Sequence, residues 1–200
     1  MTQTVVAPDA REETRARIEQ AALDLFTAQG FEQVTIDEIA EAAGISRRTF
    51  FRYVTAKADA VWGDFDAHVV RLEGMLAATA NDQSVLASIC AAYVEANDYA
   101  VADLPVLRER MRLILTEPAL LAHSELRYAE VDRAVAEHVA RRIGAGPGDL
   151  LPRLVATTTR AAATAAFEVW LADGRTPLTD HLHAAFAELA GGFPALRKGS

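Results

Sequence analysis

The stretch "TIDEIAEAAGISRRTFFRYVTAK", residues 35–57, decides the fold, and its charge is unevenly distributed. The part from Gly44 to Lys57 has no acidic residue, although the 200-residue chain has a formal net charge of −8 at pH 7. Three aromatic residues, Phe50, Phe51 and Tyr53, are interleaved with the cations of this part. Cations and rings concentrated in one short segment of an acidic chain indicate a surface for an anionic partner.

Two short helices are predicted within residues 35–57. Thr35 and Glu38 have the T-x-x-E spacing of a capping box, which begins the first helix. Gly44 breaks that helix, and Ser46 supplies a second N-cap two residues later. Two short helices around a Gly-containing turn form a helix-turn-helix, the motif that lays its second helix in the major groove of DNA.

The cations of this stretch are expected on the outward side of the second short helix. Arginine forks can reach the O6 and N7 atoms of guanine, and backbone N–H groups at a helix start can hold a phosphate. We therefore predict DNA contacts from Ser46, Arg47, Arg48, Thr49 and Arg52, followed by Tyr53 and Lys57 on the DNA backbone. The alternative is that this arginine-rich face is ordinary solvated surface.

The charge balance of the N-terminal region opposes a nucleic-acid partner. Residues 1–78 contain 13 acidic and 8 basic residues, whereas a DNA-binding domain is usually basic. The acidic residues lie mostly on the two helices that precede the basic one. We therefore expect specific binding to depend on two copies acting together.

The composition predicts an all-α, cytoplasmic protein. Alanine is abundant, Gly and Pro are sparse, and alternating β-branched runs do not stand out. The N-terminus lacks the pattern of a secretory signal, and no apolar run approaches the roughly 20 residues that span a bilayer. Cys90 is alone, which excludes an intrachain disulfide and a cysteine-based zinc site. We expect no metal, no cofactor and no membrane partner.

Turn residues divide the chain into about nine predicted helices in two domains. A three-helix helix-turn-helix head is expected at residues 9–56, and a larger helical body for ligand binding and dimerisation at residues 57–200. The body is expected to begin with one long helix from Lys57 to about Leu76. Its last two helices are predicted at about residues 149–172 and 179–190.

The stretch "TIDEIAEAAGISRRTFFRYVTAKADAV" (35–61) closely resembles the DNA-binding head of the TetR family of bacterial repressors, and the resemblance covers about residues 9–60. The resemblance implies DNA contacts from Thr35, Arg47, Arg48 and Thr49, with Tyr53 and Lys57 on phosphates. Two positions depart from the family pattern. Phe51 stands where a phosphate-binding Tyr is common, so that hydroxyl contact is missing, and Val54 replaces a common core Phe.

The body is similar to the TetR regulators associated with mycofactocin gene clusters. The similarity lies in "WGDFDAHVVRL" (62–72), "RMRLILTEPALLAHSELRYAE" (110–130) and "FEVWLADG" (167–174). That group is regarded as sensing long-chain acyl-CoA. The resemblance thus implies a ligand-responsive repressor that binds a palindromic operator as a dimer and is released by an apolar effector. A regulator of another pathway with a different apolar effector is the alternative.

The body also contains the candidates for ligand binding and dimerisation. Apolar residues that could line a cavity, or could equally be ordinary core, are Trp62, Phe65, Val69, Tyr93, Met111, Leu115, Leu121, Tyr128 and Trp170. The resemblance implies a four-helix homodimer interface made from the last two helices of each subunit. The stripes that fit it are Leu154, Thr158, Ala161, Ala162, Ala165 and Val169, with Leu182, Phe186 and Leu189.

Two other function classes compete with a repressor. A helical enzyme could use Asp64 and His68, four residues apart, beside an apolar pocket, although no nucleophile with a base and no cofactor loop is evident. A local hydrogen bond or salt link is the plainer interpretation of that pair. A helical adaptor could instead bind a protein through the arginine and aromatic face.

Overall fold

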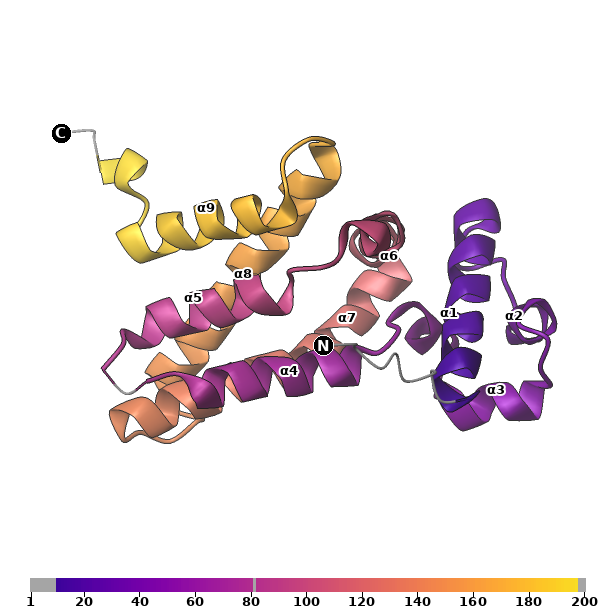
Figure 1. Ribbon diagram of the computed structural model, residues 1–200, viewed down its shortest axis with the longest axis horizontal. Coiled ribbons are helices and arrows are strands. Elements are labelled where there is room, and N and C mark those ends of the chain that lie inside the picture. The colour runs from indigo at the N-terminus through magenta and orange to yellow at the C-terminus, as the bar shows by residue number, and fades with distance from the viewer. Residues whose placement is uncertain (1–9, 81, 198–200) are drawn as a thin grey trace, which may run out of the picture. The chain divides into compact units, whose positions relative to one another are not determined.

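The computed structural model describes residues 10–80 and 82–197 (Figure 1). Each regular element in these ranges is helical. The α-helices are α1 (Ala10–Gln29), α2 (Ile36–Ala42), α3 (Arg47–Tyr53), α4 (Phe65–Ala78), α5 (Val85–Ala96), α6 (Leu104–Thr116), α7 (Pro118–Ile143), α8 (Leu150–Ala172) and α9 (Leu178–Gly191). Three short 3-10 turns are η1 (Lys57–Val61), η2 (Val101–Asp103) and η3 (Pro194–Arg197). The all-α prediction with about nine helices is confirmed for the described ranges.

The chain forms two compact units, which we call the head and the body. The head contains the residues up to Asp64 together with Arg112–His123, and the body contains Phe65–Met111 and the residues from Ser124 onward. The boundary expected after residue 56 therefore falls before the end of the head's first segment. No sequence signal indicated that residues 112–123 pack with the head, because that assignment depends on contacts between distant segments.

In the head, the predicted caps place α2 and α3. The backbone N–H of Thr35 donates to Glu38 Oε2 at 2.7 Å, and the N–H of Glu38 donates to Thr35 Oγ1 at 3.2 Å. Gly44 has a φ of +67° at the turn into α3, a conformation that favours glycine. Ser46 Oγ then accepts the N–H of Thr49 at 3.1 Å and begins α3.

The head's core is small and fully buried. Helix α1 lies against α2, and α2 lies against α3. Their apolar side chains, each 1% exposed or less, include Ile18, Leu23, Phe26, Ile39 and Phe50. The core holds α3 at the surface with one apolar side inward.

The prediction of one helix from Lys57 to Leu76 is wrong. The 3-10 turn η1 ends at Val61, and α4 begins only at Phe65. Gly63 between them has a φ of +57°, and a Cβ there would lie 2.6 Å from the carboxylate oxygens of Glu19. The positive φ favours glycine at this position, whereas the Glu19 carboxylate is the end of a flexible side chain and could move aside.

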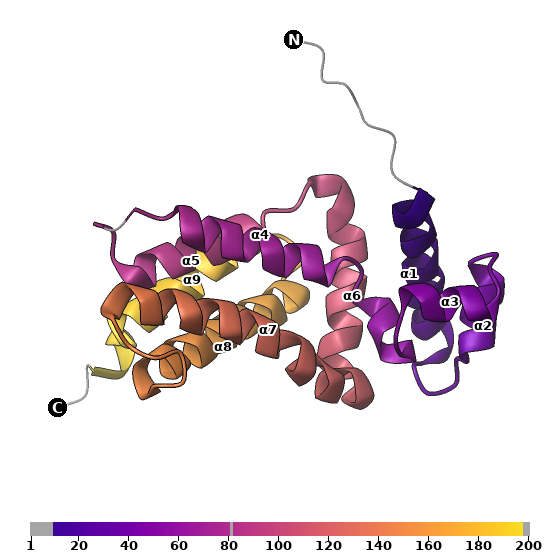
Figure 2. The ribbon, with the colours of Figure 1, turned by 90° about the horizontal axis from the view of Figure 1, so that it is seen from below.

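The body is a layered helical bundle. Helix α8 packs against α9, and α5 lies against α4, α8 and α9, as Figures 1 and 2 show from two directions. The core at these contacts includes Leu72, Leu76, Ile89, Trp170 and Leu182, each at most 2% exposed. No helix of the ranges 10–80 and 82–197 is both long and apolar enough to span a bilayer.

Candidate functional site

The outward side of α3 carries the predicted DNA contacts, and its arginines differ in their surroundings. Arg47 Nη1 lies 2.8 Å from Asp37 Oδ2, and its guanidinium lies 5.6 Å from the centre of the Phe51 ring. Arg48 is exposed and has no ion pair or hydrogen bond to any residue that the structure describes. Arg48 is therefore the arginine of α3 whose five N–H donors are available to a ligand.

The two phenylalanines of α3 have opposite roles. Phe50 is 0% exposed and forms part of the head core, whereas Phe51 is 47% exposed. Their rings meet edge to face with centroids 5.6 Å apart. Phe51 lines a shallow hollow with Arg48, Thr49 and Arg52. This hollow therefore has an exposed aromatic ring beside two arginines.

The hydroxyl groups at the starts of α2 and α3 are already hydrogen-bonded. Ser46 Oγ and Thr49 Oγ1 lie 2.9 Å apart, so each can orient the other. Thr35 Oγ1 donates to Glu38 Oε2 at 2.8 Å. The backbone N–H of Thr35, followed by its hydroxyl, lowers the pKa of Glu38, which keeps a negative charge beside Thr35. A phosphate at Thr35 would have to approach that carboxylate.

Tyr53 ends α3 beside a cation. Arg52 Nη2 donates to the Tyr53 hydroxyl oxygen at 3.3 Å, and its guanidinium lies 5.1 Å from the ring centre. The hydrogen bond from Arg52 is the main cause that lowers the pKa of Tyr53, because it favours the phenolate. These two residues stay together at the end of α3, where a phosphate contact was predicted.

Lys57 is directed toward the protein's own backbone. Its Nζ donates to the carbonyl oxygens of Phe31 at 2.7 Å and Val34 at 3.0 Å, and it lies 4.2 Å from the centre of the Phe31 ring. Two of its three N–H donors are thus used to hold the loop between α1 and α2. The sequence predicted Lys57 as a phosphate contact, whereas in the structure it stabilises the head.

The residues predicted to bind a ligand are divided between the two units. Trp62, Leu115 and Leu121 belong to the head and the other six belong to the body. Leu121 is 45% exposed, whereas Trp170 is 1% exposed. In the body, Tyr128 meets Phe65 with ring centroids 6.1 Å apart. Burial raises the pKa of Tyr128 to about 12, so its hydroxyl is neutral and can donate a hydrogen bond.

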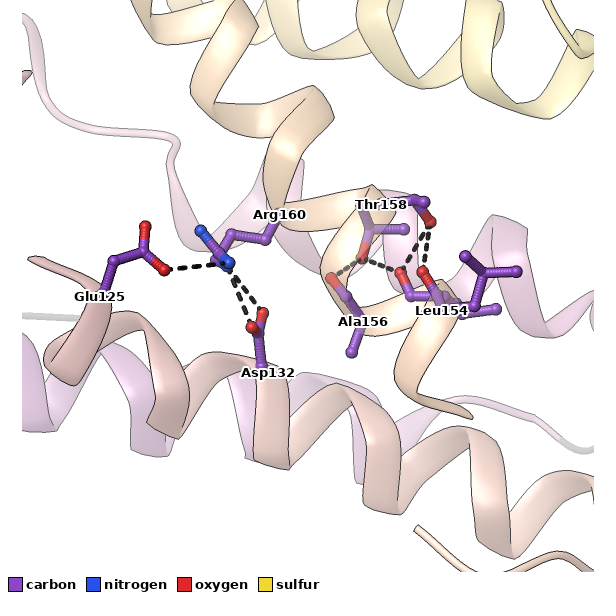
Figure 3. A network of polar contacts seen from close by, with 8 residues as sticks. Glu125, Asp132, Leu154, Ala156, Thr158 and Arg160 are labelled. Carbon is purple, nitrogen blue, oxygen red and sulfur yellow. Dashed lines mark hydrogen bonds and ion pairs between the residues drawn. The ribbon is translucent and has the colours of Figure 1, made fainter. Parts of the chain in front are cut away.

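Arg160 forms a partly buried ion cluster near these rings. On α8, its Nε donates to both carboxylate oxygens of Asp132 on α7, at 3.0 and 3.1 Å, and its Nη2 lies 3.5 Å from Glu125 Oε2 (Figure 3). Its guanidinium lies 5.7 Å from the Tyr128 ring centre. Burial raises the pKa of Asp132, and the charge of Arg160 opposes that rise. Sequence reasoning missed this cluster, because its members come from helices that only the fold brings together.

Arg108 stabilises the end of α8. Its Nη1 donates to the carbonyl oxygen of Trp170 at 2.8 Å and its Nη2 to that of Asp173 at 3.3 Å. Its guanidinium lies 3.9 Å from the centre of the Trp170 ring. The last carbonyl groups of a helix have no N–H donors within the helix, so the guanidinium of Arg108 supplies the hydrogen-bond donors that they lack.

The stripe predicted for dimerisation on α8 is at the surface. Leu154 is 51% exposed and Val169 is 54% exposed, and Ala161 and Ala165 are exposed between them. Thr158 donates its hydroxyl to the carbonyl oxygen of Leu154 at 2.7 Å, within α8 (Figure 3). The face therefore presents apolar groups and a hydroxyl that is already hydrogen-bonded. Ala162 is half-buried.

The stripe predicted on α9 is wrong in two of its three residues. Leu182 is 0% exposed and Phe186 is 3% exposed, within a single copy of the chain. The Phe186 ring lies 5.5 Å from that of Tyr93 on α5. This face of α9 covers α5 and α8, so these side chains are core and cannot meet a partner. Leu189 is half-buried.

Asp64 and His68 do not resemble a catalytic pair. Asp64 Oδ1 lies 3.2 Å from Arg15 Nη1, and His68 Nδ1 lies 3.4 Å from Arg71 Nη2. Burial, followed by the charge of Arg71, lowers the pKa of His68 to about 4, so it is neutral at pH 7. Among the residues described, no three His, Cys, Asp or Glu side chains gather as a metal site.

Two family models match the chain. The model described as "Bacterial regulatory proteins, tetR family" matches residues 18–59, and that described as "MftR C-terminal domain" matches residues 83–194. The chain is 38% identical over 188 residues to the Mycobacterium tuberculosis protein named "Putative mycofactocin biosynthesis transcriptional regulator MftR", covering 94% of this chain and 95% of that protein. The matched families and this relative are transcriptional regulators.

Solved structures share the fold at low sequence identity. The fatty acid degradation regulator FadR from Bacillus halodurans has a TM-score of 0.64 at 16% identity, covering 94% of this chain and 99% of its own. FadR from Thermus thermophilus is described as a transcriptional repressor in complex with lauroyl-CoA. Its structure has a TM-score of 0.59 at 21% identity, covering 89% of this chain and 94% of its own. At these identities the likeness concerns the fold.

Proposed function

This chain belongs to the TetR family of bacterial regulatory proteins, and from that premise we propose that it binds a palindromic DNA operator as a homodimer and is released by an apolar effector. The observation that carries the proposal is the outward face of α3, where Arg48 is exposed on a helix whose start and inner side are held by the head. A rigid helix with an available arginine fork can read guanine in the major groove.

The exposed face of α8 supports the dimer. Leu150, Leu151, Leu154 and Val169 are each more than half exposed, and Ala161 and Ala165 continue the face. Large exposed apolar patches mark sites of association, and small side chains allow two helices to approach closely. Two-fold pairing through α8 would give each dimer two copies of α3, for half-sites roughly 34–36 Å apart on DNA.

An acyl-CoA effector and a role in a mycofactocin gene cluster are the finer parts of the proposal. The Mycobacterium tuberculosis relative is named for mycofactocin biosynthesis, and the Thermus thermophilus FadR structure holds lauroyl-CoA. Phe65 and Tyr128, whose ring centroids lie 6.1 Å apart, are only partly buried and supply aromatic groups in the body that suit the acyl part of such a molecule.

Continuous helices offer a route from effector to DNA. Both α6 and α7 begin in one unit and end in the other, so two continuous helices connect the body to residues 112–123 of the head. Within the head, His123 Nε2 at the start of α7 lies 2.8 Å from Asp59 Oδ1, and Asp59 Oδ2 also accepts the N–H of Ala56. The contact between His123 and Asp59 joins α7 to η1, which directly follows α3. If effector and DNA favour different states, each weakens the other by the same factor.

Selection of bound fragments from random duplex DNA tests the proposal. We expect enrichment of a two-fold symmetric site with half-sites about one helical turn apart. Repeating the selection with lauroyl-CoA should release the site, whereas CoA alone, which lacks the acyl chain, should not. Failure to enrich any symmetric site would refute the operator, and unchanged affinity with every acyl-CoA would refute the effector while leaving the operator in place.

A further inference from the structure

We propose that Arg11, at the start of α1, joins Arg52 and Tyr53 of α3 in a binding site, called the seat, for one phosphate of the DNA backbone. Of these three residues, Arg11 lies outside the segment that the sequence predicted to touch DNA. The seat rests on the proposed DNA binding and adds α1 to the surface that grips the duplex. It would set affinity and register without reading bases.

The three side chains come from two helices and face one hollow. Arg11, Arg52 and Tyr53 line a concave patch of the head surface. Arg52 Nη2 holds the Tyr53 hydroxyl oxygen at 3.3 Å, which places a guanidinium and a phenol side by side. The charge of Arg11 acts on Tyr53 in the same sense as that of Arg52, favouring negative charge at its oxygen. Two guanidinium groups and a phenol hydroxyl therefore line one hollow.

The hollow next to this one has a different chemical character. Arg11 and Tyr53 also border a wider depression that includes the acidic residues Glu12, Glu19 and Asp64. Those carboxylates would repel a phosphate, although Arg15 Nη1 lies 3.2 Å from Asp64 Oδ1 and screens one of them. The hollow bordered by Arg11, Arg52 and Tyr53 is lined by no acidic side chain, so the anion is expected there.

The seat is continuous with the face of α3 that would read DNA. Arg52 lines both this hollow and the one formed by Arg48, Thr49 and Phe51. A strip of cations thus runs from the exposed start of α3 to the start of α1. If α3 lies in the major groove of a duplex, the backbone phosphates line the edge of that groove, next to the bases that α3 contacts.

Lys57, the predicted phosphate contact, is bound to the backbone of the head, so other cations are needed to hold a phosphate near α3. The sequence predicted that Lys57 would hold a phosphate, but two of its three donors bind the carbonyl oxygens of Phe31 and Val34. Arg11 and Arg52 are exposed. A guanidinium fork also matches two phosphate oxygens at once, which an ammonium cannot do.

Salt dependence of DNA binding tests the seat. Each neutralised phosphate contributes about 0.9 to the slope of log affinity against log salt, so Arg11→Ala in both subunits should lower that slope by roughly 1.8. Raising the salt fourfold would then weaken the wild type roughly 12-fold more than the variant. We expect the loss to be equal for the selected operator and for scrambled duplex, with the base preference unchanged.

Matched variants separate the seat from general charge. Arg17→Ala removes an exposed arginine of the same helix that lines neither hollow, and its slope should equal that of the wild type. Arg11→Lys keeps the charge and should keep most of the slope. Thermal unfolding of each variant, followed by circular dichroism, checks that the head is folded.

The outcomes are distinct. A slope for Arg11→Ala that equals those of the wild type and Arg17→Ala would overturn the seat, provided that the wild type still binds its operator. Competition by inorganic phosphate or pyrophosphate at millimolar concentration, with no effect of Arg11→Ala on duplex binding, would assign the hollow to a small anion and also overturn it. A wild type without preference for any operator would instead refute the proposed function.

Discussion

Replacing Arg48 with Ala should relax the base preference of the dimer at one position of each half-site. Arg48 has no partner among the described residues, so its fork is available to a guanine, and such a contact is worth about 1–3 kcal/mol. The two half-sites are far apart, so their losses add to about 2–6 kcal/mol per dimer. Since about 1.4 kcal/mol is a factor of ten, operator affinity should fall by roughly 30-fold to 10⁴-fold.

Arg47→Ala should behave differently. To contact DNA, Arg47 must leave Asp37, and an exposed ion pair of this kind is worth about 0.2–1 kcal/mol, so the net contribution of Arg47 is smaller. Its removal also leaves the Asp37 carboxylate without its 2.8 Å partner close to the predicted DNA surface. That negative charge repels every duplex alike, so operator and scrambled DNA should weaken by similar factors.

Fluorescence anisotropy with labelled duplexes at one fixed salt concentration distinguishes the two variants. The titrations use the operator, its single-base variants and a scrambled duplex, with Arg141→Ala on the last turn of α7 as a control for lost charge. Light scattering confirms that each variant remains a dimer. An Arg48→Ala variant that keeps the full base preference, or an Arg47→Ala variant that relaxes it, would contradict the different roles assigned to the two arginines.

Three further predictions concern association and stability. Leu154→Glu should raise the dissociation constant of the proposed dimer at least about tenfold, because the new charge would be buried in the interface without a partner. Leu126→Glu, at an exposed position of α7, should leave the dissociation constant unchanged. Light scattering over a dilution series measures both. Lys57→Met should lower the free energy of unfolding by about 1–3 kcal/mol in a urea titration, because two bound carbonyl oxygens lose a charged donor, and a stable variant with weaker DNA binding would restore Lys57 as a phosphate contact. His68, with its pKa lowered to about 4 in the folded chain, binds a proton more readily when unfolded, so stability should fall by up to about 3 kcal/mol as pH drops from about 6.5 to about 4. His68→Phe should flatten that dependence, and an unchanged pH profile would contradict it.

The helix-turn-helix could be predicted from residues 35–57 because its signals are local. Thr35 caps α2 through Glu38, three residues away, and Ser46 caps α3 through Thr49 at the same spacing. Phe50 is buried because its place on α3 follows from helical periodicity. Each of these effects acts within about one turn of helix, so neighbouring residues are enough to specify it.

The two errors have different sources, one local and one distant. Helix α4 was expected to begin at Lys57, but Gly63 has a φ of +57°, which interrupts a right-handed helix, and α4 begins only at Phe65. Leu182 and Phe186 have the spacing of an exposed stripe, yet α5 and α8 cover them. An apolar stripe has the same sequence pattern whether its own chain or a second copy covers it.

The sequence alone determined the all-helical class, the caps of α2 and α3 and the position of a cationic face, since propensity, capping and periodicity depend on residues a few positions apart. Only the tertiary structure decided which cations remain available for DNA, because an ion pair forms wherever packing brings opposite charges together. Packing directs Arg47 to Asp37, Lys57 to two carbonyl oxygens and Arg160 to Asp132, while it leaves Arg48 exposed on α3.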